Sequence, residues 1–282
     1  ANKANWVENQ DYWVERAKNL EDKLSDRLHE ELTKTFIDKR ASVLARGLKQ
    51  DITFSTEIIE DEKVMINNQY IGNLKGLKLH LDLKVDALDA DIKSLKKAAR
   101  QNVSPEIIKR IKQIIDTGLI ELKKDFKIYW KNNQIAKLLP GEDYLNPKIH
   151  LLIDDMIEND ERSKLDLFIQ GWIQKKINTE LKSLVDLKNT QEKNSDLRAL
   201  AYHLYENNGV VKREDVLSYL KKLDQNERKK LRNLGVRFGR YHIFLFKLFK
   251  PSTVSLRTLL WKNYHEKNEQ LEPPTFGLNF LE

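Results

Sequence analysis

The sequence contains no cysteine, few glycines and prolines, and no long apolar run. Structural disulfides and thiolate metal sites are therefore excluded, which favours a reducing compartment, and we expect the cytoplasm. No stretch approaches the roughly 18–20 apolar residues that a membrane-spanning helix needs. The opening residues, Ala1–Ala4, have no apolar segment behind them and do not resemble a signal peptide. We expect a soluble chain without a membrane partner.

The common catalytic and cofactor motifs are also missing. The sequence has no glycine-rich phosphate loop, no dinucleotide-binding glycine pattern and no H-E-x-x-H, and its six histidines are scattered. Two acidic groups, Asp154-Asp155 and Glu60-Asp61-Glu62, lie in polar stretches where neighbouring carboxylates are usually solvated. We therefore expect no catalytic residue, no cofactor and no metal site in this chain, and an unrecognised hydrolase is the least favoured interpretation.

Acidic residues are absent from one long segment. The 282-residue chain carries a net charge of +7, yet Arg228–His265 contains ten Lys and Arg residues and no Asp or Glu, so the remainder sums to −3. The positive charge is a local feature. The ten cations of this basic block are Arg228, Lys229, Lys230, Arg232, Arg237, Arg240, Lys247, Lys250, Arg257 and Lys262.

Apolar spacing predicts helices at the N-terminus and strands after them. Leucines recur every four residues from Leu20 to Leu32, so residues 1–50 are expected to form two helices, with Ser25 as the N-cap of the second. Residues 77–85 alternate between apolar and polar side chains, as in a half-buried strand. Helices are expected over about 87–101 and from Ser104-Pro105-Glu106 onward, where Pro105 would take a favourable first position.

The strand pattern recurs further along the chain. Residues 63–74 and 127–138 both contain an Asn-Asn-Gln turn between apolar runs, a hairpin signal. We interpret them as two copies of a small β-hairpin-plus-strand unit, each followed by helices; a chance resemblance of two hairpins is the alternative. The residues that coincide at a constant offset are Lys63/Lys127, Asn68/Asn132, Ile71/Ile135 and Leu74/Leu138.

The sequence pattern of the C-terminal third predicts a compact helical domain. A polar stretch, 188–195, marks the expected domain boundary, and three short helices follow it. Asp224 with Glu227 resembles a capping box that opens the third helix, which ends at Gly235. The expected fold is mainly α with a minor β component (α+β). Its expected parts are a helical segment (1–50), an α+β region (51–187, with β units at 51–101 and 125–187), a basic helical region (195–265) and a tail (266–282).

The basic block also contains aromatic residues, and both are typical of nucleic-acid binding. Clustered Lys and Arg attract phosphates through charge neutralisation and counterion release, and aromatic rings stack on unpaired bases. The aromatic run Phe244–Phe249 is better explained as core than as a base platform. For the cations, polyanion binding is favoured over an acidic protein surface, and membrane contact is least favoured because Pro251 interrupts the amphipathic pattern.

Both ends of the chain resemble a known family. Leu234-Gly235-Val236-Arg237-Phe238-Gly239, Lys250-Pro251 and Leu256-Arg257, together with Leu24–Thr33 and Phe36–Arg40 near the N-terminus, resemble the region after the second motor domain of alphaproteobacterial RNA helicases. Those proteins are similar to the mitochondrial degradosome helicase. The family implies ATP-driven RNA unwinding coupled to degradation. The motor's phosphate loop and DExH box are absent here, so no catalytic residue carries over, and ATP and Mg²⁺ are implied only for the motor.

These observations lead to two main hypotheses. The first is a non-catalytic accessory region that binds RNA; its candidate residues are Arg237, Arg240, Lys247, Lys250 and Arg257, with Arg40 and Arg46 as weaker candidates. The second is a protein-interaction scaffold whose basic block docks an acidic partner, either the helicase motor or a nuclease, without RNA. The missing initiator Met fits a processed chain, a split gene product or a piece of a longer protein.

Overall fold

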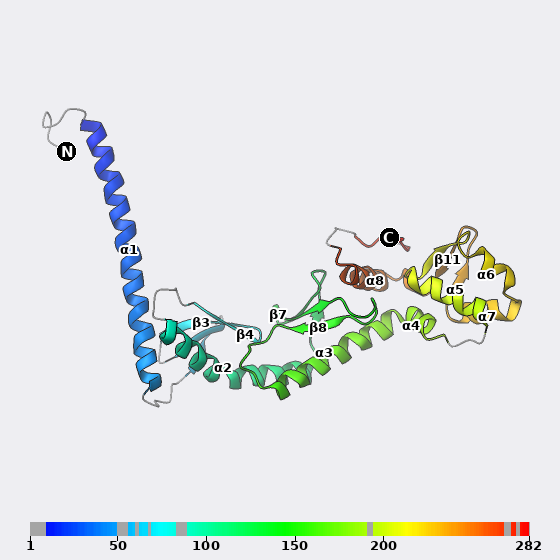
Figure 1. Ribbon diagram of the computed structural model, residues 1–282, viewed down its shortest axis with the longest axis horizontal. Coiled ribbons are helices and arrows are strands. Elements are labelled where there is room, and N and C mark those ends of the chain that lie inside the picture. The colour runs from blue at the N-terminus through cyan, green and yellow to red at the C-terminus, as the bar shows by residue number, and fades with distance from the viewer. Residues whose placement is uncertain are drawn as a thin grey trace. The chain divides into compact units, whose positions relative to one another are not determined.

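The computed structural model describes most of the chain, and Figure 1 labels its elements. The described residues are 10–49, 56–59, 62–66, 69–82, 89–190, 194–267, 272–274 and 277–281. Their helices and small antiparallel sheets confirm the α+β fold class. Residues 1–110 with 154–157 form one compact unit, and 111–153 with 158–282 form a second. The division falls inside helix α2 (Asp89–Thr117) and not at the polar stretch 188–195.

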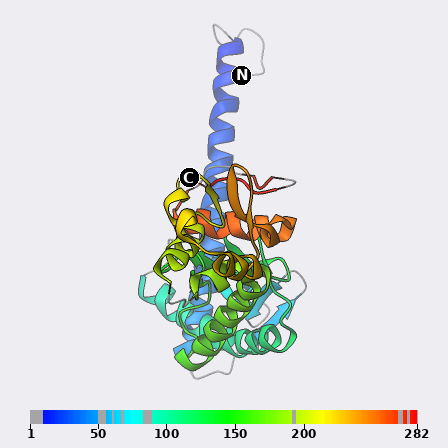
Figure 2. The ribbon, with the colours of Figure 1, turned by 90° about the vertical axis from the view of Figure 1, so that its right-hand side faces the viewer.

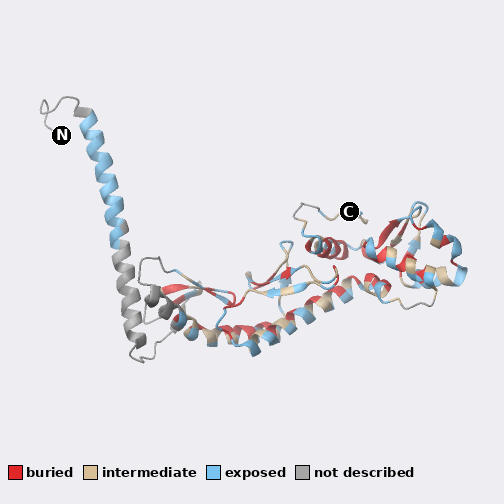
Figure 3. Cartoon of the chain, viewed as in Figure 1, coloured by how far each residue is buried: buried red, intermediate tan, exposed pale blue. Residues whose placement is uncertain are grey.

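Helix α1 (Gln10–Lys49) opens the first unit as one uninterrupted helix (Figure 1 and Figure 2). The prediction of two helices with Ser25 as an N-cap is wrong. Ser25 stands among Leu, Lys, Glu and Arg, which favour helix strongly enough to carry it through. The side chains described on α1 are exposed, including those of Leu20, Leu24, Leu28 and Leu32 (Figure 3).

Helix α2 also continues where a break was predicted, because Pro105 lies inside it. A proline in a helix removes one i→i−4 hydrogen bond. The buried residues Ala99, Val103 and Ile107 nevertheless stay in phase across this position, so packing favours one helix over two. Ser104, expected to cap a second helix, instead donates a hydrogen bond from Oγ to the backbone oxygen of Arg100 at 2.9 Å.

Each unit contains a four-stranded antiparallel sheet whose strands neighbour one another in chain order, which confirms the two predicted β units. The first sheet consists of β1 (Thr56–Ile59), β2 (Lys63–Ile66), β3 (Gln69–Lys75) and β4 (Lys78–Leu81). The second consists of β5 (Glu121–Leu122), β6 (Lys127–Trp130), β7 (Asn133–Leu139) and β8 (Lys148–Leu151). Strand β4 is shorter than the predicted strand 77–85, and residues 83–88 lie outside the described part.

The two sheets pair their strands in the same register. Lys63 faces Asn73 in the first sheet, and at the equivalent positions Lys127 faces Lys137 in the second. A bulge interrupts the pairing after Val64 and again after Ile128. Glu62 and Phe126, which precede these strands, both have positive φ angles, of 61° and 62°. The same hairpin, including its bulge and its left-handed turn residue, is therefore folded twice.

A helix follows each sheet, and the two helices match position by position. Helix α3 (Asn159–Glu180) follows the second sheet as α2 follows the first, with Asn159 equivalent to Asp89. The offset between the helices exceeds that between the hairpins, because the loop between β7 and β8 is longer than the turn between β3 and β4. The buried positions match as well, so each sheet and its helix repeat as one unit. The matching pairs within the two helices are Ala99/Ile169, Val103/Ile173 and Ile107/Ile177, and the spacing continues beyond the end of α3 with Ile111/Leu181 and Ile114/Leu184.

Asp154 is buried, although a solvated position was predicted for it. Its side chain is 2% exposed, and Oδ1 lies 3.4 Å from Nε of Arg100 on α2. Its backbone N–H donates to the oxygen of Leu77 at 3.1 Å. A buried carboxylate needs such a partner, because an unpaired charge is costly away from water. Asp154 therefore ties residues 154–157 to the first unit.

After its sheet and helix, the second unit continues with the element order of a winged helix–turn–helix. A helix, a strand, two helices and a β-hairpin follow one another, and the strands associate in the order β10-β11-β9. The elements of this winged helix are α5 (Ser195–Glu206), β9 (Val210–Lys212), α6 (Leu217–Lys222), α7 (Gln225–Asn233), β10 (Val236–Phe238) and β11 (His242–Leu245).

Tyr144, in the loop between β7 and β8, joins this loop to the winged helix, and Lys188 joins the same loop to helix α4 (Lys182–Lys188). The Tyr144 hydroxyl donates to the backbone oxygen of Tyr205 at 2.9 Å, and the two rings stack with centroids 5.1 Å apart. Burial raises the pKa of the Tyr144 hydroxyl, so it stays protonated and donates. The Lys188 ammonium donates to the Asp143 carboxylate.

A short 3₁₀ helix, η2 (Phe246–Phe249), and helix α8 (Pro251–Tyr264) complete the second unit. Pro251 opens α8 at its first turn, where the missing N–H costs nothing. The hydroxyl of Thr253 donates to the backbone oxygen of Glu180 at 3.4 Å, so α8 packs against the end of α3.

Candidate nucleic-acid interface

The third helix of the winged helix, α7, presents basic residues to solvent. The predicted capping box is confirmed: the Asp224 side chain accepts from the Glu227 N–H at 2.7 Å, and the Glu227 carboxylate accepts from the Asp224 N–H at 2.9 Å. The two acids beside α7 are thus engaged in holding its first turn. Leu231 packs into the core, while Lys229 and Arg232 are exposed.

The wing is the turn between β10 and β11, and Arg213 holds it in place. The Arg213 guanidinium donates to the oxygen of Gly239 at 2.9 Å, and the Arg213 backbone N–H donates to the oxygen of Tyr241 at 2.8 Å. Gly239 is required because a Cβ there would lie 2.7 Å from the oxygen of His242. At the tip, Arg240 and Tyr241 both face solvent: Tyr241 is 68% exposed, and the guanidinium lies 5.4 Å from its ring centroid.

A second cluster of cations and rings lies at the edge of the sheet. Arg237 is exposed on β10, and its guanidinium lies 5.8 Å from the ring centroid of Phe246, which is 55% exposed. The Phe246 N–H donates to the oxygen of Gly235 at 3.2 Å, and the stem of Lys247 packs over Gly235. The structure thereby places Arg237 beside the exposed ring of Phe246, and Lys247 follows that residue on η2 with its stem over Gly235.

A third pair joins α7 to the sheet, since the Arg232 guanidinium lies 5.6 Å from the ring centroid of Phe238. Each of these pairs offers both ingredients of single-strand recognition, a charge for phosphate and a planar face for a base. We call this set the basic–aromatic surface. It comprises Lys229 and Arg232 on α7, Arg237 on β10, Arg240 and Tyr241 on the wing, and Phe246 and Lys247 on η2.

The remaining candidate cations have different surroundings. Lys250 is exposed at the start of α8. The prediction that Arg257 is a surface residue is wrong, because it is 0% exposed. Its guanidinium donates from Nη1 to the oxygen of Asn208 at 3.2 Å and from Nη2 to Oδ1 of Asn279 at 3.1 Å. Burial lowers its pKa to about 10. Arg40 and Arg46 lie on α1 where the side chains are outside the described part.

The aromatic run is divided between core and surface. Leu245 and Leu248 are fully buried, as predicted, and Phe244 stacks on Phe249 with centroids 5.3 Å apart. The prediction that Phe246 belongs to the core is wrong: Phe246 is exposed, because the chain turns from strand into 3₁₀ helix at this residue. The alternation of inward and outward side chains along β11 therefore does not determine where the Phe246 side chain points.

Sequence reasoning missed the roles of three residues. Lys229 and Arg232 were counted only as part of the basic block, and Arg213 lies outside it. The capping box just ahead of Lys229 identified the third helix. The polar face of that helix would have indicated Lys229 and Arg232. Nothing local in the sequence indicates Arg213, because two helices and a strand separate it from its partners along the chain.

Comparison with protein-family models, curated proteins and solved structures gave no match. Within the described ranges, none of the helices combines the length and apolar character that crossing a bilayer requires. Over the same residues, no three His, Asp or Glu side chains are grouped as a metal site would need. Inferences about function therefore depend on the surface and on the sequence resemblance.

Proposed function

We propose that this chain is a non-catalytic RNA-binding region, an accessory part of a cytoplasmic RNA helicase-like protein that supports RNA unwinding and degradation. The observation that carries the proposal is the basic–aromatic surface on a winged helix, within a segment that contains no acidic residue from Arg228 to His265. The cations would neutralise phosphates, and Tyr241 and Phe246 would stack on bases. The sequence resemblance supplies RNA as the nucleic acid.

The test is fluorescence anisotropy of the purified chain with labelled single-stranded and duplex RNA across a salt series. The proposal expects micromolar or tighter binding with a log–log salt slope of several units. The double variant Arg237→Glu/Arg240→Glu changes two exposed residues and should weaken binding to every RNA sequence at least tenfold, because phosphate contacts carry no sequence information.

The matched control is Lys175→Glu/Lys182→Glu. It changes the net charge equally at two exposed positions on α3 and α4. We expect a much smaller loss of affinity, and a salt slope near that of the wild type. Equal losses in the two double variants would mean that only net charge matters, and unchanged affinity in the Arg237/Arg240 variant would remove the proposal.

A second candidate function is a protein-interaction scaffold. The exposed leucines of α1 favour it: Leu20, Leu24, Leu28 and Leu32 are 49 to 62% exposed at a spacing of four residues. In this alternative the basic block docks an acidic partner, either the helicase motor or a nuclease. Binding to a motor fragment after nuclease treatment, combined with no measurable affinity for RNA, would put this function first.

A further inference from the structure

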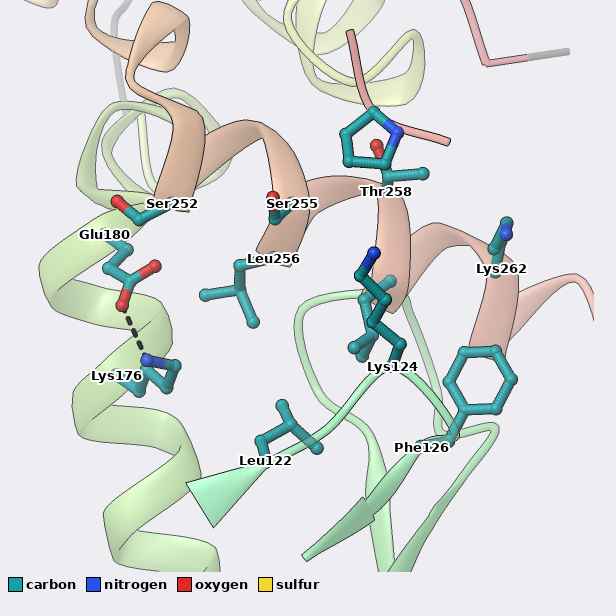
Figure 4. Close-up of a pocket in the computed structure, with 12 residues that line it drawn as sticks. Leu122, Lys124, Phe126, Lys176, Glu180, Ser252, Ser255, Leu256, Thr258 and Lys262 are labelled. Atoms are coloured by element: carbon teal, nitrogen blue, oxygen red, sulfur yellow. Dashed lines mark hydrogen bonds and ion pairs between the residues drawn. The ribbon is translucent and has the colours of Figure 1, made fainter. Parts of the chain in front are cut away.

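A cavity of about 260 Å³ lies between α3, α8 and the turn that joins β5 to β6, all in the second unit. Figure 4 shows Lys124 reaching into the space between this turn and α8, with Phe126 and Lys262 on one side and Leu122 and Leu256 on the other. Lys176 and Glu180 of α3 pair with each other at its edge, 2.7 Å apart. The cavity thus has an apolar floor and cations at its rim.

The repeat shows how this cavity arises. In the first unit, the left-handed residue Glu62 pairs with Arg110 of α2 at 3.3 Å, and Arg110 also donates to the oxygens of Leu74 and Gly76 at 3.3 and 2.9 Å. At the positions equivalent to Glu62 and Arg110, the second unit has Phe126 and Glu180. These two cannot form an ion pair, so the tie between turn and helix is missing.

Phe126 is not required by the fold of its turn. Glu62 adopts the same left-handed backbone at the equivalent position, with a φ angle of 61° against 62°. The backbone contacts of Phe126, from its N–H to the Lys123 oxygen at 3.2 Å and from the Leu138 N–H to its own oxygen at 2.7 Å, do not involve its ring. The ring contributes to the cavity and is available to a ligand.

Apart from the Lys176–Glu180 pair, several polar groups around the cavity lack partners. Among the described residues, the side chains of Lys124 and Lys262 have neither an ion pair nor a hydrogen bond. Thr258 is 2% exposed and its Oγ1 has no hydrogen-bond partner, which is costly for a buried hydroxyl. Threonine populates two χ1 rotamers in helices, so this hydroxyl can turn toward a bound molecule. Ser252 and Ser255 add two exposed hydroxyls on the same helix.

A planar ring, two unpaired cations and nearby hydroxyls together match the chemistry of one nucleotide. The cavity is slightly below the range of roughly 300–1,000 Å³ that drug-sized ligands occupy, which suits a single base with its sugar and phosphate at the rim. We propose that this cavity holds one unpaired nucleotide, its base against Phe126, its phosphate between Lys124 and Lys262, and its polar edge toward Thr258.

The proposal deepens the RNA-binding function, which supplies the nucleotide, but it can be tested without RNA. Saturation-transfer NMR with AMP, UMP and adenosine on the full chain should show transfer to the base protons. Phe126→Ala should abolish this transfer. Phe126→Leu keeps an apolar side chain, so it shows how much of the transfer depends on the aromatic ring. The control Tyr202→Ala removes an exposed ring on α5 and should leave transfer unchanged.

The phosphate part has its own readout. AMP should bind at least threefold more tightly than adenosine, and Lys124→Glu/Lys262→Glu should remove that difference. Transfer that is absent, or unchanged in Phe126→Ala, would overturn the proposal. Displacement of AMP by inorganic phosphate without any base-proton transfer would also overturn it, because the site would then hold an anion only.

Binding experiments with RNA distinguish failure of this proposal from failure of the proposed function. They also distinguish a site for free nucleotides from a site for RNA. Phe126→Ala should lower the affinity for a single-stranded oligonucleotide and leave the affinity for a duplex unchanged. Arg237→Glu/Arg240→Glu should lower both affinities. If mononucleotides bind through Phe126 but no RNA binds, the ligand is a free nucleotide and the RNA-binding function fails alone. If RNA binds and Phe126→Ala changes neither readout, the cavity proposal fails alone.

Discussion

Arg257 donates a hydrogen bond from Nη1 to the backbone oxygen of Asn208, 3.2 Å away, and neither residue is exposed. Asn208 itself has a positive φ of 54° and lies between α5 and β9. The bond therefore fixes the turn at the start of the winged-helix sheet to α8. One of the ten cations in the basic block thus has a structural role.

Replacing Arg257 should lower stability and not RNA affinity. Arg257→Met keeps the apolar stem but leaves the Asn208 oxygen buried without a donor, which costs about 1–3 kcal/mol. Urea unfolding should show this as a lower midpoint. Lys250→Met, which changes an exposed cation of the same block, should leave the midpoint unchanged. A midpoint equally lowered in both variants would contradict the prediction.

Removing the exposed rings should weaken single-stranded RNA more than duplex RNA. Stacking contributes about 1–3 kcal/mol per base, and paired bases present no free face. Tyr241→Ala and Phe246→Ala should each lower single-strand affinity accordingly in anisotropy. Tyr202→Ala removes a ring that is 59% exposed on α5 and is the matched control. Equal losses on both RNA types would indicate that the rings act through packing.

Acid should weaken the contact between Asp143 and Lys188. Partial burial acts to raise the pKa of Asp143, but hydrogen bonds from Lys188, Leu145 and Asn146 outweigh it and hold that pKa below its usual 3.8. A carboxylate with a lowered folded-state pKa contributes stability that is complete above its unfolded pKa and is lost as pH falls through the folded value. This contribution should therefore be complete above about pH 4.

The measurement is thermal unfolding of the wild type and Asp143→Asn at several pH values. At neutral pH the variant should melt at a lower temperature, because its neutral amide can accept a hydrogen bond from Lys188 but lacks the negative charge that attracts the ammonium. Below pH 4 the two curves should converge, since the wild-type carboxyl is then becoming protonated. A difference that is constant across the whole range would mean that the charge of Asp143 is irrelevant to stability.

Gly209→Ala should destabilise the winged helix. Gly209 has a φ of 90°, and an added Cβ would lie 2.4 Å from Cδ1 of Leu248. The strained backbone and the clash together should cost about 1–3 kcal/mol. Gly118→Ala has a positive φ of 63° with nothing within 4 Å, so it measures the backbone cost alone. A larger loss in Gly118→Ala than in Gly209→Ala would contradict the role given to Leu248.

Sequence patterns identified features that depend on neighbouring residues. The hairpin spacing placed both β units, and the capping box at Asp224 and Glu227 placed α7. Breaks at Ser25 and Pro105 were predicted from the same kind of local preference and were wrong. In α2 the buried stripe of Val103 and Ile107 packs on both sides of the proline, and packing energy exceeds the loss of one backbone hydrogen bond.

The sequence by itself determined the α+β class, the repeated hairpin and the confinement of positive charge to one segment. Each of these depends on residues close together in the chain or on composition. Only the tertiary structure decided that Arg257 is buried and Phe246 exposed, and that Phe126 shares a cavity with Thr258. The physical reason is that burial depends on partners far along the chain: the acceptors of Arg257 lie 49 and 22 residues away.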